Sequence, residues 1–161
     1  MLIGIISDSH DNIDNIKKAV KIFQNKKTDL VLHLGDYINP GAVKVLEGLK
    51  IIGIFGNNDG DKFRLINAFN QIKGEIKGDF YEFEQDNLKI ALYHGTESQI
   101  KDALINCNKY DVVLYGHTHI KENKIVGKTL IINPGTSHGF GNEATIATFN
   151  SKNKKVEFIE L

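Results

Sequence analysis

The sequence predicts an α/β sandwich formed by a single domain, residues 1–161. Apolar runs rich in Ile, Val and Leu recur along the first 115 residues, and amphipathic segments separate them. Strands that alternate with helices favour a parallel α/β core. After residue 120 the pattern changes to short alternating strands, which favours an antiparallel end. With 161 residues, 41% of them hydrophobic, the chain is long enough to bury the core of one domain.

Five apolar runs predict the strands of the core. Continuous apolar runs are typical of strands that are covered on both faces. These runs are "LIGII" at 2–6, "LVLHL" at 30–34, "IIGIF" at 51–55, "LKIALY" at 88–93 and "VVLY" at 112–115. Further strands are expected after residue 120, with turns at Gly127 and at 150–153.

Four segments between the strands have apolar residues at near-helical spacing. Asn12 or Asp11 is expected to cap the first helix, and Pro40 precedes the second. The apolar positions are Ile13, Ile16, Val20 and Phe23; Val43, Val45, Leu46 and Leu49; Leu65, Ile66 and Phe69; and Ile100, Leu104 and Ile105.

Composition and charge exclude several classes of protein. Twenty Lys and Arg balance twenty Asp and Glu, so the extended basic footprint of a nucleic-acid binder is absent. Zero net charge permits self-association, and a homo-oligomer is therefore compatible with the sequence. The single cysteine, Cys107, excludes an internal disulfide framework and fits a reducing cytosol, and we expect it to be buried. Because "MLIGIIS" has no basic leader and no run is long enough to span a bilayer, we expect a cytoplasmic protein without a membrane partner.

Metal-competent side chains follow each of the five apolar runs. The carboxyl ends of the strands form the binding edge of an α/β sheet, so residues that are distant in sequence converge there. Asp8 and His10 stand at i and i+2, as do His117 and His119; in an extended segment each pair points to one side. Each pair alone could simply consist of polar loop residues. Metal-competent residues at the ends of five strands favour the interpretation that they are metal ligands. The candidate metal ligands are Asp8, His10, Asp36, Asn57, His94, His117 and His119.

This ligand set predicts two divalent ions in one centre. Seven ligands are too many for one tetrahedral catalytic ion, but they suffice for two ions that share a bridging carboxylate. Oxygen and imidazole ligands without thiolate suit manganese, iron, zinc or nickel better than Cu(I), and the ligands do not choose among these four. We expect manganese first, with nickel, iron or zinc as alternatives. Paired ions activate a water and neutralise phosphoryl oxygens, so phosphoester hydrolysis is the expected reaction.

The ordered motifs "DSH", "GD", "GNND", "H" and "GHTH" resemble those of the calcineurin-like metallophosphoesterases. The resemblance runs from Asp8 to His119 and on to "NPGT" at 133–136. The short chain is similar to the small, capless YfcE-like phosphodiesterase branch, which also includes a retromer subunit. It implies two facing β-sheets flanked by helices, a four-layer αββα fold, with the metals at the strand ends.

The resemblance also implies a division of the ligands and a substrate. Asp36 would bridge the two ions, and a hydroxide between them would attack a small-molecule phosphodiester. Asp8, His10 and His119 would hold one ion, and Asn57, His94 and His117 the other.

Four further residues near these motifs are considered for a role in the site. The family has a histidine that protonates the leaving group where this chain has Asn58, and an amide cannot supply a proton. Asp59 either orients a ligand or caps the following helix; we place it with Asn58 as a catalytic candidate. His138 is either exposed or contacts the phosphate, and His33 is expected to be a core residue.

Two alternatives to the phosphodiesterase remain. A phosphomonoesterase or nucleotide pyrophosphohydrolase would use the same site. A non-catalytic protein-interaction scaffold would show a degraded set of ligands, whereas all seven are present.

Overall fold

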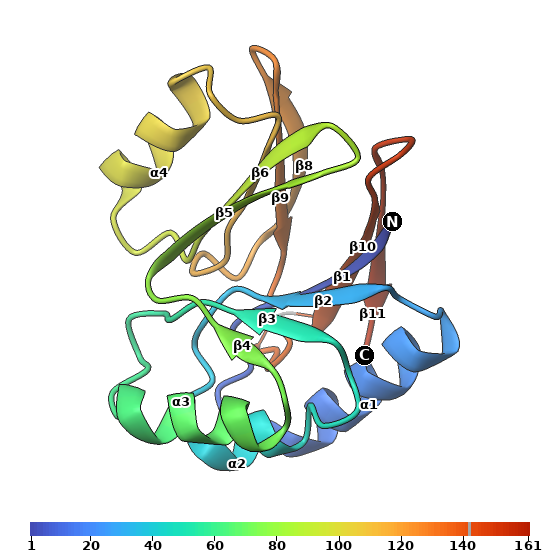
Figure 1. The fold of residues 1–161 in the computed structure, drawn as a ribbon, viewed down its shortest axis with the longest axis vertical. Coiled ribbons are helices and arrows are strands. Elements are labelled where there is room, and N and C mark those ends of the chain that lie inside the picture. The colour runs from blue at the N-terminus through green and yellow to red at the C-terminus, as the bar shows by residue number, and fades with distance from the viewer. Residues whose placement is uncertain (142) are drawn as a thin grey trace.

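Two β-sheets face each other between two layers of helices in the computed structural model, which describes residues 1–141 and 143–161. Figure 1 shows α1, α2 and α3 along the outer side of one sheet and α4 along the outer side of the other. This arrangement confirms the predicted four-layer αββα fold.

The first sheet has six strands in the order β11-β10-β1-β2-β3-β4. Strands β1 to β4 run parallel, and the β10–β11 hairpin adds two antiparallel strands beside β1. The strands are β1 (Leu2–Ile6), β2 (Leu30–His33), β3 (Ile51–Gly53), β4 (Glu75–Ile76), β10 (Thr145–Asn150) and β11 (Lys155–Glu160).

The second sheet has five strands in the order β5-β6-β7-β9-β8. The predicted antiparallel pairing is confirmed for the β8–β9 and β10–β11 hairpins, but on its other side β9 pairs parallel with β7. The reason is that the β8–β9 hairpin reverses the chain, so its returning strand lies alongside β7 in the same direction. The strands are β5 (Phe80–Gln85), β6 (Leu88–Tyr93), β7 (Val112–Leu114), β8 (Lys121–Val126) and β9 (Thr129–Pro134).

The helices match the predicted segments except for the length of the second. They are α1 (Ile13–Asn25), α2 (Pro40–Lys44), α3 (Lys62–Gln71) and α4 (Ser98–Asn106). Asn12 caps α1 as expected, because its side chain accepts from the Asn15 N–H. The chain leaves the helical path after α2 and reaches Gly48 at φ +88°, a backbone that ends a helix. Leu46 and Leu49 are nevertheless buried.

Apolar side chains form three layers of contact. Alternation along β1 sends Ile3 and Ile5 into the layer between the sheets, while Ile6 belongs to the layer beneath α1 to α3. On the opposite sheet Val113 packs with Ile105 of α4. Both faces of the central strands are therefore covered, as the continuous apolar runs predict.

Two further observations concern the surface. The expectation that Cys107 is buried is wrong: the residue follows α4 at its C-terminal cap, and its thiol is exposed and donates to the Leu104 carbonyl. Within residues 1–141 and 143–161, no helix combines the length and hydrophobicity that crossing a membrane requires.

Phe23 is fully buried under β1, and a Cβ at Gly4 would lie 2.6 Å from its ring. We expect Phe23→Ala to lower the free energy of unfolding by about 3–5 kcal/mol, because the cavity cannot close completely. Phe63→Ala is the control: this ring is 83% exposed, and its loss should change the free energy by less than about 0.5 kcal/mol. Urea denaturation measures both, and equal effects would contradict this description of the core.

Candidate metal centre

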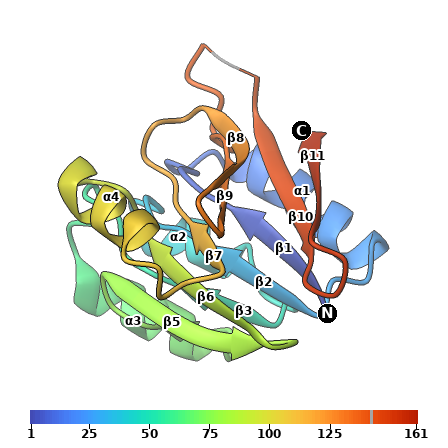
Figure 2. The same cartoon turned by 90° about the horizontal axis from the view of Figure 1, so that it is seen from above.

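The strand ends of both sheets converge on one site. The strands concerned are β1, β2 and β3 of the first sheet and β6 and β7 of the second, labelled in Figure 2. Each strand is followed by at least one candidate ligand. Two groups of potential ligands result, Asp8 with His10 and His119, and Asp8 with Asp36 and His94.

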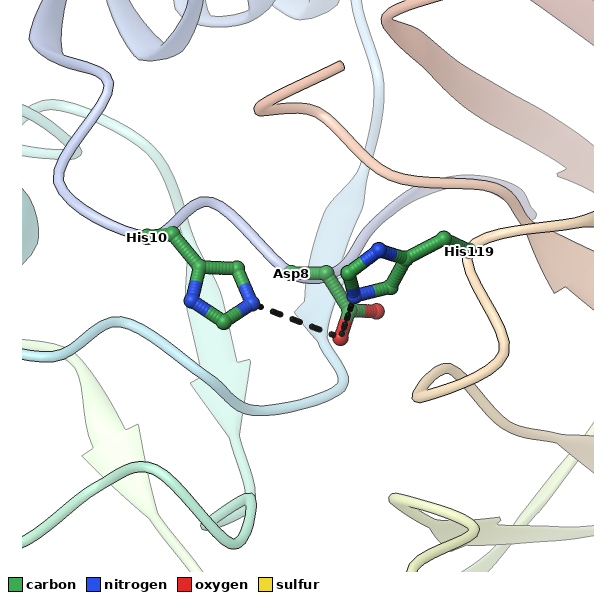
Figure 3. Close-up of side chains that lie close together, drawn as sticks. All are labelled: Asp8, His10 and His119. Carbon is green, nitrogen blue, oxygen red and sulfur yellow. Dashed lines mark ion pairs between the residues drawn. The ribbon is translucent and has the colours of Figure 1, made fainter. Parts of the chain in front are cut away.

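Asp8 presents one carboxylate oxygen to two imidazoles, as Figure 3 shows. Its Oδ1 lies 3.2 Å from His119 Nε2 and 3.9 Å from His10 Nε2. Its Oδ2 accepts from the Ser7 hydroxyl at 2.5 Å and from the His117 N–H at 3.1 Å. These two donors fix the carboxylate so that Oδ1 faces the site.

Asp36 lies between the histidines of the two groups. Its Oδ2 is 3.4 Å from His10 Nε2 and also 3.4 Å from His94 Nε2. His94 Nδ1–H donates to the Leu34 carbonyl at 2.7 Å, which leaves Nε2 directed at the carboxylate. A hydrogen bond from the other ring nitrogen is the usual way in which proteins orient a histidine ligand.

His117 and His119 lie beside different histidines of the site. The His117 ring lies beside His94, with centroids 5.3 Å apart, and the His119 ring beside His10, at 5.5 Å. The expectation that an extended backbone directs both side chains to one side is wrong, because both residues have a positive φ.

The backbone explains why the spacing argument fails. A residue with φ near +60° is in the left-handed region, which side chains rarely adopt, so the segments are not extended. Such conformations cost about 1–3 kcal/mol each and gather at functional sites. The candidate ligands in this region are Asp8 (φ 52°), His10 (39°), Asp36 (60°), His117 (64°) and His119 (60°).

Two glycines permit this close approach of the chain segments. A Cβ at Gly116 would lie 2.7 Å from Asp8 Oδ2, and one at Gly35 would lie 2.5 Å from the Gly56 nitrogen. Gly35 also has φ +101°. No other residue fits at either position without displacing a ligand segment.

Asp59 holds the segment that carries Asp36. Its buried carboxylate accepts from the N–H groups of Asp36, Tyr37 and Ile38 at 2.7–3.0 Å, and from that of Gly56 at 2.7 Å. Burial raises the pKa of Asp59, while these donors act in the opposite direction. The capping interpretation is wrong, because Asp61 caps α3.

The two asparagines of this loop lie at its exposed side. Asn58 donates to Asp36 twice, from its N–H to Oδ1 at 2.9 Å and from Nδ2 to Oδ2 at 2.8 Å. Asn57 Oδ1 accepts from the Thr96 hydroxyl at 3.4 Å, and Asn57 and His94 line the same groove. Asn58 therefore contacts the carboxylate that lies between the two groups.

The remaining two histidines differ in their surroundings. His33 is a buried core residue, as expected: burial lowers its pKa to about 3. Its Nδ1 accepts from the Gly35 N–H and its Nε2 lies 3.1 Å from the Ser9 hydroxyl. His138 is half-buried, and its ring stacks on Phe140 with centroids 3.6 Å apart. Phe140 is not among the predicted site residues, although its position between two glycines in "GFG" indicates an unusual backbone.

The aspartates and histidines of the site shift one another's pKa values. Burial opposes ionisation of Asp36, but His94 and Asn58 outweigh it and hold the pKa of the carboxyl well below its ordinary value. Burial also acts to lower the pKa of His94, yet Asp36 and Asp8 raise it overall. The Asp8 carboxylate, whose Oδ1 lies 3.2 Å from His119 Nε2, raises the pKa of His119. Asp36 thus stays ionised, and the two aspartates favour protonation of the neighbouring imidazoles of His94 and His119.

Several buried polar atoms of the site have no hydrogen-bond partner, and they show whether the site fits metal ions. Over residues 1–141 and 143–161, the buried side-chain atoms without a hydrogen-bond partner are Asp8 Oδ1, His10 Nε2 and His94 Nε2. All three belong to this site. Buried polar atoms in native proteins nearly always have a partner, and a divalent cation satisfies oxygen and imidazole lone pairs together. The residues present therefore fit such ions.

Comparisons with known proteins match both the motifs and the fold. The family model for the calcineurin-like phosphoesterase superfamily domain matches residues 1–154. Phosphodiesterase MJ0936 of Methanocaldococcus jannaschii is 40% identical over 143 residues, which are 87% of this chain and 86% of that protein. Phosphodiesterase YfcE of Escherichia coli K12 is 24% identical over 84% of this chain and 79% of that protein. A solved structure described as a novel archaeal phosphodiesterase has a TM-score of 0.93 at 36% identity, with 100% of both chains covered.

Asp59→Asn is expected to weaken binding of Mn²⁺ by about 10- to 100-fold, the usual effect of removing a group that orients a ligand. The new amide would direct an NH₂ group at the backbone donors that the carboxylate now satisfies. Asp61→Asn is the matched control, because asparagine caps a helix as well as aspartate does. Isothermal titration calorimetry measures both, and unchanged affinity in Asp59→Asn would contradict the assigned role.

Ion binding is expected to release protons and to weaken as the pH falls. The raised pKa values of His94 and His119 mean that both imidazoles keep a proton over a wider pH range, and an ion must displace it. Mn²⁺ titrations at about pH 6 and about pH 8, in buffers of different ionisation enthalpy, measure the released protons. His138→Gln is the control, and it should leave the number of released protons unchanged. Affinity that does not depend on pH would contradict this assignment of charge.

Proposed function

The chain belongs to the calcineurin-like phosphoesterase superfamily, and on that premise we propose that it hydrolyses phosphodiesters at a centre of two divalent ions. The observation that carries the proposal is the set of three buried, unpartnered atoms on Asp8, His10 and His94. They lie among candidate ligands whose backbones are held in the left-handed region.

We assign the seven candidate ligands to two ions. Asp36 would contact both, because its Oδ2 is equally distant from His10 and His94. When bound, two divalent ions supply positive charge for the phosphoryl oxygens and make a water or hydroxide between them nucleophilic at neutral pH. Manganese is expected first, with nickel, iron or zinc as alternatives. Asp8, His10 and His119 would hold one ion, and Asn57, His94 and His117 the other.

The chain itself supplies orientation and charge. Asp36 stays ionised because His94 and Asn58 stabilise its carboxylate, and Asp59 fixes the backbone that carries it. Asn58 has an exposed amide that donates hydrogen bonds but cannot transfer a proton. Leaving groups that depart without a proton are therefore favoured.

The adjoining groove favours a small substrate. It has a volume of about 380 Å³ and is open to solvent beside Asn57 and His94. Binding sites for small molecules commonly measure about 300–1,000 Å³. The balance of 20 basic and 20 acidic residues provides no extended surface for nucleic acid. A small-molecule phosphodiester is the substrate class that fits.

The first test is hydrolysis of bis-p-nitrophenyl phosphate by metal-stripped protein, titrated with Mn²⁺ and then with Ni²⁺, Zn²⁺ and Mg²⁺. We expect metal-dependent turnover that falls by more than about 100-fold in Asp36→Ala, since loss of a shared ligand should exceed the effect of losing a supporting group. Faster hydrolysis of p-nitrophenyl phosphate would identify a phosphomonoesterase instead. Metal binding without cleavage of either ester would favour the protein-interaction scaffold.

Asn58→His is expected to restore general-acid catalysis. It should accelerate hydrolysis of an alkyl diester by about 10²–10⁴-fold and change that of a p-nitrophenyl diester little, because nitrophenolate leaves without protonation. Asn58→Gln is the matched control, since it keeps an amide. Equal acceleration of both esters would contradict the role assigned to Asn58.

A further inference from the structure

An exposed phenyl ring stands beside the candidate metal centre. Phe140 lies in the loop between β9 and β10 and is 51% exposed. Its ring is nearly parallel to that of His119, with an interplanar angle of 8° and centroids 5.5 Å apart, and it meets the edge of His10 at 4.7 Å. Burial in the core does not account for a large apolar side chain at this place.

The loop is tied to the segment that carries Asp8. The N–H of Ser137 donates to the Ser7 carbonyl at 3.0 Å, and that of His138 to the Asp8 carbonyl at 3.1 Å. From α1, Asn15 Nδ2 donates to the Ser137 carbonyl at 2.9 Å. These bonds fix the base of the loop relative to the candidate ligands.

His138 supports one face of the phenyl ring. The two rings stack with centroids 3.6 Å apart and an interplanar angle of 22°. The Phe140 N–H donates to His138 Nδ1 at 3.2 Å, which fixes the orientation of the imidazole. The ring of Phe140 is thus positioned by three histidines, His10, His119 and His138, while about half of its surface remains accessible.

The backbone of Phe140 is itself unfavourable. Its φ is +33°, between Gly139 at +101° and Gly141 at +81°. Bulky side chains seldom adopt a positive φ, and glycine or asparagine would fit this conformation better. A strained residue beside a candidate site indicates that the side chain serves the site.

We propose that Phe140 determines specificity by stacking on a planar ring of the substrate, a nucleobase or an aryl group carried by the ester substituent that stays on phosphorus when the leaving group departs. This inference rests on the proposed function. Aromatic rings stack on bases and on other rings through their faces, and Phe140 is half-exposed while its ring lies within 4.7 Å of the His10 ring and 5.5 Å of the His119 ring, centroid to centroid. The groove beside Asn57 and His94 adjoins the other set of candidate ligands and has room for the second substituent.

A purely structural role for Phe140 predicts a different result. If the ring only packed against His10 and His119, its removal would weaken metal binding and slow every substrate alike. Stacking instead predicts a loss confined to substrates that carry a second ring. The two roles are separated by substrates that share one leaving group.

The test compares three p-nitrophenyl diesters whose other substituent is methyl, p-nitrophenyl or thymidine 5′-yl. In Phe140→Leu we expect kcat/KM to fall by about 5- to 100-fold for the two ring-bearing esters and by less than about twofold for the methyl ester, as the strength of ring stacking implies. A larger loss for the thymidine ester would identify a nucleobase. Phe63→Leu, at an exposed phenyl ring on α3, should change none of the three. An equal loss for all three esters, or no loss, would overturn the proposal.

A binding measurement keeps this test separate from that of the proposed function. Phenylphosphonate and methylphosphonate cannot be hydrolysed, and calorimetry on Mn²⁺-loaded protein gives the dissociation constant of each. The wild type should prefer the phenyl compound by about fivefold or more, and both Phe140→Leu and Phe140→Asn should lose that preference with unchanged Mn²⁺ affinity. If the wild type shows the preference but cleaves no diester, the stacking site stands and the hydrolase proposal fails. If it cleaves diesters without any ring preference, the stacking proposal fails alone.

Discussion

Two buried carboxylates, Asp8 and Asp36, are the constraint on which the rest of the structure depends. Burying ionised groups is costly unless charge and hydrogen bonds compensate. Backbone and amide donors satisfy part of each carboxylate. His94 lies beside Asp36 and His119 beside Asp8, and the pKa of each imidazole is raised. The remaining unpartnered lone pairs are concentrated at one point, and that concentration is what makes the site suited to divalent cations.

This geometry requires strained backbone conformations at the strand ends, and the surrounding fold stabilises them. Left-handed residues at Asp8, Asp36 and His117 direct side chains from two sheets toward one volume. Asp59 clamps the Asp36 segment through four N–H groups, and the apolar layers on both sides of each sheet keep the strands in register. Phe140, beside the candidate ligands His10 and His119, is a further residue with a positive φ that contacts with its neighbours hold in place.

The sequence was most informative where local chemistry determines the outcome. Continuous apolar runs located the central strands, Asn12 was identified as a helix cap, and His33 as a core residue. The sequence was misleading where tertiary contacts determine the conformation. The backbone at His117 and His119 is left-handed where an extended segment was expected, and the direction of β9 depends on how the β8–β9 hairpin docks. The position of Phe140 beside His10 and His119 depends on contacts between its loop and the segment after β1.

Whether two ions share Asp36 can be seen in a crystal structure of Mn²⁺-loaded protein with anomalous scattering data. We predict two anomalous peaks about 3.5–4 Å apart, with Asp36 contacting both, His10 and His119 at one, and His94 and His117 at the other. A single peak, or two peaks of which Asp36 contacts only one, would contradict the account.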